Sequence, residues 1–373
     1  MDSLDQPLTF FDQISRLDLV SILLPGFFAF VVGILITPIV THFMFKHELW
    51  KKKSVAKSVD GKKATITAKL HADEKRKVPR MGGLVIVLSI IITVGLFWAI
   101  GRLLPDIWVA ELDLVDRNET WLPLFALLSG FVLGVLDDLA VVGKLQFLKS
   151  KFGKYAGDGL SLKMRILLVA FVGAVAGWWF YSKLGVDSIF IPFWQDLHIG
   201  VLIIPFIVMV MVATYSGGII DGIDGLSGGV FSIIFSSYAL IALLQGRLDL
   251  AALCVVIVSG LLAFLWFNIP PARFYMSETG TMALTLTVSI IAFITDTALL
   301  LPIIAFPLLI STLSVMIQVT SKKFRGGKKV FIVSPIHNHY QALGWPGPKV
   351  VMRYWVFSQF MAVGGLIIFL LGY

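Results

Sequence analysis

The chain has 373 residues, of which 57% are hydrophobic and 14% are charged, and its mean hydropathy is +0.89. So few charged residues cannot cover the surface of a soluble protein, and apolar stretches of about 20 residues, the length that crosses a bilayer as a helix, recur along the chain. The net charge of +8 is better explained by the basic loops of a membrane protein than by nucleic acid, so we expect no nucleic-acid partner.

The apolar stretches do not alternate as the strands of a membrane barrel do, which predicts an all-α, polytopic fold. No soluble segment is long enough to fold by itself, so we expect residues 1–373 to form a single domain. The single cysteine, Cys254, excludes a disulfide framework, and we expect no signal peptide at the start of the chain. About ten spans are predicted, at residues 18–45, 81–103, 121–139, 165–183, 198–217, 226–244, 249–267, 281–295, 298–319 and 351–371.

Basic residues in the loops predict the orientation of these spans. Lysine and arginine number 12 in residues 46–80, 6 in residues 140–165, 1 at Arg273 and 7 in residues 320–353. If ten spans alternate across the bilayer, these 26 residues share one side, and the other 5 of the 31 lie opposite. Because basic loops stay in the cytoplasm, we expect both termini outside the cell.

Two acids, Asp137 and Asp138, close the third span. Neighbouring residues of a helix point about 100° apart, so the pair cannot clamp one ion together. One carboxylate can still face a metal or a proton while the other faces a cation. A solvated helix end is the plain alternative, but ionisable groups directly after an unbroken apolar stretch are costly and usually functional.

Residues 215–226, between the fifth and sixth spans, combine Asp221 and Asp224 with four glycines. Glycine lets backbone amides approach phosphates, while carboxylates can hold Mg²⁺. The pattern is typical of a site for a nucleotide or a metal-bound diphosphate. A flexible turn capped by aspartate is the alternative, but a turn alone does not need two acids three residues apart.

Further polar groups follow the seventh span. Asn268 ends that span, Tyr275 can stack on a base, and Glu278 can bind a hard cation. Arg273 can pair with a phosphate or simply anchor the loop in the cytoplasm. Each of these signals is weak by itself.

The last basic loop contains His337, Asn338 and His339. No third ligand at a suitable spacing suggests zinc, so we expect these side chains to donate to phosphate oxygens. Lys75 opens a basic turn, residues 75–83, which can grip an anionic substrate or bind lipid headgroups. Carboxylates, phosphate-binding cations and a membrane frame together indicate a reaction between two phosphates, one of them on a lipid, with Mg²⁺ and a nucleotide leaving group.

From Lys75 to the last span, these motifs resemble the polyprenyl-phosphate N-acetylhexosamine-1-phosphate transferases, and among them the bacterial phospho-N-acetylmuramoyl-pentapeptide branch. The most specific matches are Phe264-Leu-Trp-Phe-Asn268, Ser311-Thr-Leu-Ser-Val315 with Gln318-Val319, and Pro335-Ile-His337 through Gly344-Trp345. The resemblance implies transfer of the sugar phosphate from UDP-MurNAc-pentapeptide to undecaprenyl phosphate, which releases UMP and forms lipid I for peptidoglycan. It also implies Mg²⁺ as cofactor, a homodimer, and a cytoplasm-facing site in the bacterial inner membrane.

The resemblance also assigns roles by position. It implies that Glu278 and Asp221 bind the metal. The catalytic residues that it implies are Asp137, Asp138, Asp221, His337 and His339. The substrate-binding residues that it implies are Lys75, Arg165, Asp224, Asn268, Tyr275 and Asn338.

Five positions depart from the family pattern. Ser277-Glu278 replaces Gly-Asp, so the metal ligand is one methylene longer. Gly218 replaces an asparagine, and Asn338 replaces the central histidine of a triplet. Val141 stands where a lysine is expected, with Lys144 nearby as a substitute.

These departures leave three alternatives open: a different UDP-N-acetylhexosamine donor, altered metal geometry, or an inactive scaffold. A two-step route through an aspartyl intermediate is also open. Transport is disfavoured, because transporters place their polar sites near the bilayer midplane, in internal repeats that this chain lacks.

Overall fold

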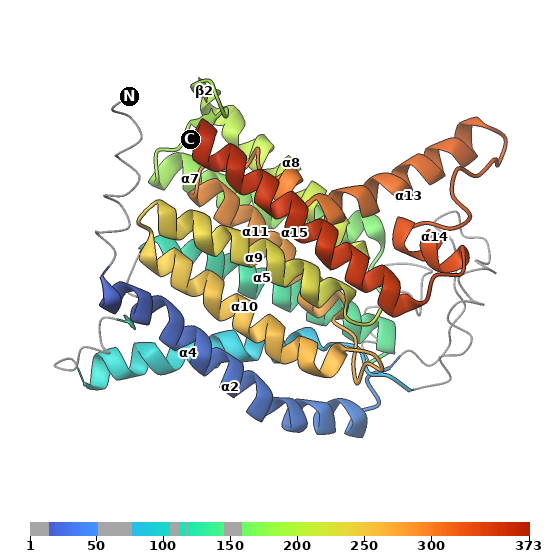
Figure 1. Ribbon diagram of the computed structural model, residues 1–373, viewed down its shortest axis with the longest axis horizontal. Coiled ribbons are helices and arrows are strands. Elements are labelled where there is room, and N and C mark those ends of the chain that lie inside the picture. Colours follow the sequence, from blue (N-terminus) through green and yellow to red (C-terminus); the bar gives the residue numbers. More distant parts are fainter. Residues whose placement is uncertain (1–14, 51–76, 105–111, 116–117, 145–158) are drawn as a thin grey trace.

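The computed structural model describes residues 15–50, 77–104, 112–115, 118–144 and 159–373 (Figure 1). Within these residues the fold is helical, apart from a hairpin of two antiparallel strands, β1 (Ser188–Phe190) and β2 (Asp196–His198). The expected all-α, polytopic class is confirmed. The helices that fill the bundle are α2 (Arg16–Lys46), α4 (Gly83–Leu103), α5 (Asn118–Val142), α7 (Leu162–Lys183), α8 (Ile203–Ser216), α9 (Leu226–Leu244), α10 (Leu248–Asn268), α11 (Ser277–Ile294) and α15 (Gly347–Gly372). Shorter elements are the 3-10 turns η2 (Gly200–Leu202) and η3 (Gly217–Ile220), and α14 (Ile336–Ala342).

Nine of the described helices are long and apolar enough to cross a membrane, one fewer than the ten spans expected. The difference lies at residues 298–319, where the chain forms two helices, α12 (Leu301–Ile304) and α13 (Phe306–Phe324). Proline occupies the first turn of each. Because proline lacks an amide hydrogen, it starts a helix more readily than it continues one, which explains the break. In Figure 1, α13 leaves the bundle at an angle. The side of the membrane on which the termini lie, and the single domain, stay predictions.

Helix α11 forms the centre of the bundle and contacts α4, α5, α8 and α9. Almost every residue from Thr279 to Ile294 is buried. The neighbouring helices therefore shield α11 from lipid on all sides, and hydroxyl groups within it donate hydrogen bonds to carbonyls of the preceding turn.

Glycines let α5 approach α11 very closely. A Cβ atom on Gly130 would lie 2.6 Å from the carbonyl oxygen of Met282, and one on Gly134 would overlap the carbonyl oxygen of Glu278. Small residues four positions apart allow membrane helices to pack backbone against backbone. Asp138 follows Gly134 by four residues and therefore lies on the same face, directed at the start of α11.

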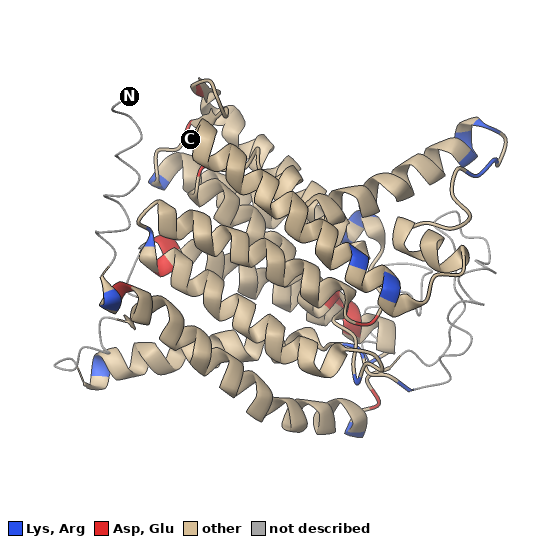
Figure 2. Ribbon diagram, in the orientation of Figure 1, with Lys and Arg blue, Asp and Glu red and all other residues tan. Residues whose placement is uncertain are grey.

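Charged side chains of the described residues gather near the two ends of the bundle, and the middle is apolar (Figure 2). One end carries Lys349 and Arg353 at the start of α15 and the basic tip of α13. Four acids also lie near this end, where α5 ends and α11 begins. The polar groups singled out in the sequence therefore share one end of the molecule.

Candidate active site

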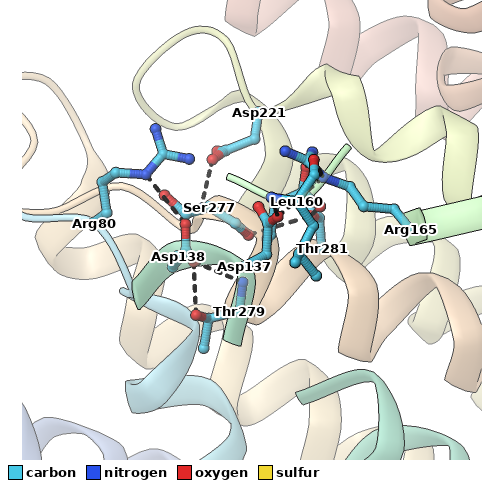
Figure 3. Close-up of polar contacts among 10 residues, drawn as sticks. Arg80, Asp137, Asp138, Leu160, Arg165, Asp221, Ser277, Thr279 and Thr281 are labelled. Carbon is cyan, nitrogen blue, oxygen red and sulfur yellow. Dashed lines mark hydrogen bonds and ion pairs between the residues drawn. The ribbon is translucent and has the colours of Figure 1, made fainter. Parts of the chain in front are cut away.

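Asp138 is buried and fully hydrogen-bonded (Figure 3). Its Oδ1 atom accepts a hydrogen bond from Nε of Arg80 at 3.1 Å. Its Oδ2 atom accepts two, from the Thr279 amide at 2.9 Å and the Thr279 hydroxyl at 2.7 Å. Asp138 therefore joins the end of α5 to the first turn of α11 and to the turn before α4.

Asp137 is equally buried, but only one of its carboxylate oxygens has a hydrogen-bond partner among the described residues. Its Oδ1 atom pairs with Nε of Arg165 at 3.0 Å and accepts a hydrogen bond from the Leu160 amide at 2.7 Å. Its Oδ2 atom has no hydrogen-bond partner among the described residues. Gly159 makes this geometry feasible, because it has a φ of +81° and a Cβ there would lie 2.7 Å from Oδ1 of Asp137.

Arg165, in the first turn of α7, links Asp137 to Glu278. Its Nη1 atom donates to Oε1 of Glu278 at 2.7 Å, and its guanidinium also hydrogen-bonds the Tyr215 hydroxyl. The other carboxylate oxygen of Glu278 accepts a long hydrogen bond of 3.4 Å from Thr281. The structure therefore brings together three sequence-predicted residues from α5, α7 and α11.

Asp221 lies just beyond η3 and faces the start of α11. Its Oδ1 atom accepts a hydrogen bond from the Ser227 hydroxyl, and its Oδ2 atom accepts one from the Ser277 amide, both at 2.7 Å. Burial raises the pKa of this carboxyl, although the two hydrogen bonds and the charge of Arg80 oppose the shift.

Asp224 and Asn268 tie the glycine-rich loop to the loop before α11. Asp224 accepts a hydrogen bond from the Ala272 amide at 3.0 Å. Asn268 accepts one from the Gly225 amide at 2.9 Å and donates one to the Phe274 carbonyl at 2.8 Å. These two side chains lie near the predicted site, and their contacts hold its two loops in register.

His337 packs directly on the glycine-rich loop. A Cβ on Gly222 would lie 2.5 Å from Nε2 of His337, whose side chain is fully buried. Asn338 is also buried, and its Oδ1 atom has no hydrogen-bond partner among the described residues. His339 points elsewhere: its Nδ1 atom accepts a hydrogen bond from the Ile332 amide at 3.3 Å. Of the two histidines, the described contacts therefore place only His337 against the loop of Asp221.

Tyr275 contributes backbone contacts to the site. Its amide donates to the Pro79 carbonyl at 2.9 Å, and its carbonyl accepts a hydrogen bond from the Gly82 amide at 2.7 Å. These bonds join the turn before α4 to the turn before α11. Lys75, predicted to bind substrate, lies outside the described residues.

The sequence reading did not assign roles to Arg80, Ser277 and Thr279. Arg80 stands in the Pro-Arg-Met-Gly-Gly turn, whose unusual composition was the available signal. Ser277 was noted only as a departure from the family's glycine, and nothing in the local sequence marks Thr279. The contribution of both residues depends on a helix start that only the folded chain brings to the aspartates.

The substitute lysine expected for Val141 is not found at the site. Val141 is buried, whereas Lys144 is exposed and forms no ion pair with the described residues. Arg80 instead supplies a second cation beside the aspartate pair.

Asp137, Asp138, Asp221 and Glu278 share this site with two guanidinium groups, those of Arg80 and Arg165. Fully ionised, four carboxylates and two arginines leave two negative charges. Among the described residues, no three histidine, cysteine or acidic side chains form a ready metal cluster. The arrangement can bind a cation together with phosphate groups, at the end of a helical bundle that a lipid can reach.

A helical membrane bundle that gathers carboxylates and guanidinium groups at one end is suited to a membrane-embedded enzyme that acts on phosphates. Residues 120–296 match the model of glycosyl transferase family 4. Phospho-N-acetylmuramoyl-pentapeptide-transferase of Chlorobium phaeobacteroides (strain BS1) is 31% identical over 79% of this chain and 81% of its own length. The enzyme of the same name from Geobacillus thermodenitrificans (strain NG80-2) is 34% identical over 79% of this chain and 85% of its own length.

A third relative of that name, from Desulfotalea psychrophila, is 32% identical over 76% of this chain and 78% of its own length. The chain belongs to the phospho-N-acetylmuramoyl-pentapeptide-transferase family. It is therefore a multi-pass membrane protein of an enzyme family, as the sequence motifs predicted.

Proposed function

We propose that this protein transfers phospho-N-acetylmuramoyl-pentapeptide from its UDP donor to undecaprenyl phosphate, which releases UMP and forms lipid I for peptidoglycan synthesis. An oxygen of the lipid phosphate attacks the β-phosphorus of the donor. The new bond joins that oxygen to the β-phosphorus, and the bond from the β-phosphorus to the bridging oxygen breaks. UMP leaves with the bridging oxygen and the bonding electron pair, so no other reactant is needed.

The observation that carries this proposal is the difference between the two aspartates. Asp138 has both oxygens occupied by hydrogen bonds, whereas Oδ2 of Asp137 is buried and has no partner among the described residues. A buried carboxylate oxygen with no donor is costly, and such groups persist where a ligand supplies the missing contact. The carboxylate of Asp137 therefore acts as the base that takes a proton from the lipid phosphate, or orients that phosphate. Asp138 holds the site together.

The residues present fit a divalent cation. The site has two excess negative charges when ionised, and carboxylates are the ligands that Mg²⁺ prefers. Mg²⁺ commonly takes one or two protein carboxylates and completes its shell with water and substrate phosphates, so Glu278 and Asp221 suffice as ligands. The chemistry that such an ion supplies when bound is neutralisation of the charge on the diphosphate.

The site faces the cytoplasm in this proposal. Its end of the bundle carries the basic residues of α13 and α15, and basic loops stay on the cytoplasmic side. The UDP-linked donor is a soluble molecule and can enter from that side, while the lipid phosphate reaches the helix ends from the bilayer. A homodimer in the bacterial inner membrane completes the proposal.

The experiment is UMP release by the purified protein in detergent, with undecaprenyl phosphate and either UDP-MurNAc-pentapeptide or UDP-GlcNAc. We expect release from the muramoyl donor, loss of release on adding EDTA and recovery with Mg²⁺. Release from UDP-GlcNAc alone would favour the other N-acetylhexosamine donor. No release from either donor would refute the enzymatic proposal.

A further inference from the structure

Arg80 is held in place by backbone contacts on both sides. Its amide donates to the Leu49 carbonyl at 2.8 Å. The flanking Pro79 and Gly82 form hydrogen bonds with the backbone of Tyr275, at 2.9 Å and 2.7 Å. Met81 has a φ of +72°, an uncommon conformation for a residue with a side chain. The turn that presents Arg80 is therefore fixed before any substrate binds.

The side chain of Arg80 is oriented through only one of its three nitrogens. Nε donates to Oδ1 of Asp138, and Thr279 holds the opposite oxygen of the same carboxylate, so this contact cannot rotate freely. The two terminal Nη atoms form no hydrogen bond with the described residues. The side chain is 27% exposed, whereas that of Asp138 is fully buried. Figure 3 shows the terminal nitrogens beyond the Asp138 contact, on the side of Asp221.

A guanidinium with this geometry is suited to a tetrahedral anion. Its terminal N–H groups form a planar fork that matches two oxygens of a phosphate, and it stays charged at any physiological pH. Arg80 also interacts electrostatically with Asp221 and Glu278, so it belongs to the same site. A purely structural salt bridge would not need the exposed half of the guanidinium.

We propose that Arg80 binds a substrate phosphate through its Nη atoms, while Asp138 acts as a positioning residue that aims the guanidinium. The phosphate belongs either to the diphosphate of the donor or to the lipid. This inference rests on the proposed function where it is tested by enzyme kinetics. Phosphate binding can also be measured without turnover. Arg165 cannot take this role alone, because its guanidinium is already shared by Asp137 and Glu278.

The first test is chemical protection of the unmodified protein. Phenylglyoxal modifies accessible arginines, and mass spectrometry of the peptides reports the rate at each one. We expect inorganic pyrophosphate or dodecyl phosphate to slow modification of Arg80 at least about fivefold. Arg247 is the matched control, since it is 35% exposed and pairs with Glu119 at the opposite end of the bundle. The probe that protects identifies the source of the phosphate, and equal rates with and without both probes would overturn the proposal.

The second test compares Arg80→Lys with Arg247→Lys. Lysine keeps the charge and a donor for Asp138 but lacks the fork. We expect Arg80→Lys to raise KM for one substrate about tenfold to a hundredfold, the effect of a lost charge-assisted contact, while Tm changes little. A lowered Tm with both KM values unchanged would make Arg80 purely structural. If the wild-type protein shows no turnover but pyrophosphate or dodecyl phosphate still protects Arg80, the proposed function fails and the phosphate site stands.

Discussion

Replacing Asp137 or Asp138 with asparagine should damage the protein in two different ways. The change Asp137→Asn keeps the shape of the side chain and removes the negative charge next to the unpartnered oxygen position. The change Asp138→Asn puts one amide group where a carboxylate now accepts three hydrogen bonds. We therefore expect Asp137→Asn to lower activity strongly and stability less than Asp138→Asn does, and Asp138→Asn to lower both.

The magnitude follows from the contacts. An asparagine at position 138 has one acceptor oxygen. If that oxygen faces Thr279, the NH₂ group of the asparagine faces Nε of Arg80, so two donors meet and no hydrogen bond forms between them. One charge-assisted hydrogen bond is lost, which costs about 1.5–3 kcal/mol. Removing one partner of a fully buried ion pair costs about 3–5 kcal/mol, but Arg80 is 27% exposed and water can replace part of the contact. We therefore expect Asp138→Asn to lower the free energy of unfolding by about 2–3 kcal/mol, the upper part of the range for a lost charge-assisted hydrogen bond.

At position 137 the two donors, Arg165 and the Leu160 amide, can still share the amide oxygen. The contact with Arg165 loses its charge assistance, but Arg165 keeps its ion pair with Glu278, so stability should fall by about 1.5 kcal/mol, the lower end of the range for a charge-assisted hydrogen bond. If Asp137 handles the proton of the lipid phosphate, kcat should fall about 10²–10⁴-fold, the usual contribution of a general acid–base group.

Thermal unfolding in detergent and UMP release measure the two effects. Glu119→Gln is the control, because it is also an acid-to-amide change at an ion pair with an arginine, but at the far end of the bundle. It should alter stability by at most about 1 kcal/mol, as surface ion pairs do. The reasoning is wrong if Asp137→Asn keeps full turnover, or if Asp138→Asn unfolds at the wild-type temperature.

Three further predictions concern packing, pH and orientation. Gly134→Ala should lower the free energy of unfolding by about 1–3 kcal/mol and reduce activity, because a methyl group there would push the Glu278 backbone away from α5. Gly95→Ala is the control: there is open space around Gly95, so this change should lower stability little. Burial raises the pKa of Asp221, so protons should compete with Mg²⁺ for this carboxylate: the Mg²⁺ concentration that gives half-maximal UMP release should rise as pH falls, and a Mg²⁺ requirement that does not change with pH would contradict this origin. A membrane-impermeant maleimide should label Lys328→Cys only from the cytoplasmic side and Trp194→Cys only from outside. The native Cys254 is buried and should give little background labelling. The reverse pattern would refute the orientation.

Hydropathy was enough to predict the fold class and nine spans, because a bilayer requires long apolar helices whatever their neighbours are. It did not predict the break at residues 298–319, where the chain forms two helices instead of one. Pro302 and Pro307 were the sequence signal for this break, since each lies in the first turn of a new helix. The direction in which α13 departs depends on packing against α14 and α15, which no local pattern encodes.

Acids are easy to find in an apolar chain, and Asp137, Asp138, Asp221 and Glu278 were all identified as site residues from their types and positions. Their partners were harder to identify. Thr279 and Ser277 act through amides at the start of α11, and Leu160 acts through its amide alone. A backbone group has no sequence signature, so the residues that orient the acids appear only when the helices are packed.

Most of the polar motif residues at this end of the bundle form hydrogen bonds that connect loops, and these groups are not available to bind substrate. Asp224 and Asn268 join the glycine-rich loop to the loop before α11, and Asp138 joins three segments through one carboxylate. A site made from the ends of separate membrane helices needs such ties, because lipid supplies no hydrogen bonds to fix the loops. Among the described residues, the groups at this end that have no hydrogen-bond partner are therefore few, and they include Oδ2 of Asp137, Oδ1 of Asn338 and the terminal nitrogens of Arg80. Asp221 and Glu278 would have to exchange present hydrogen bonds for a bound cation.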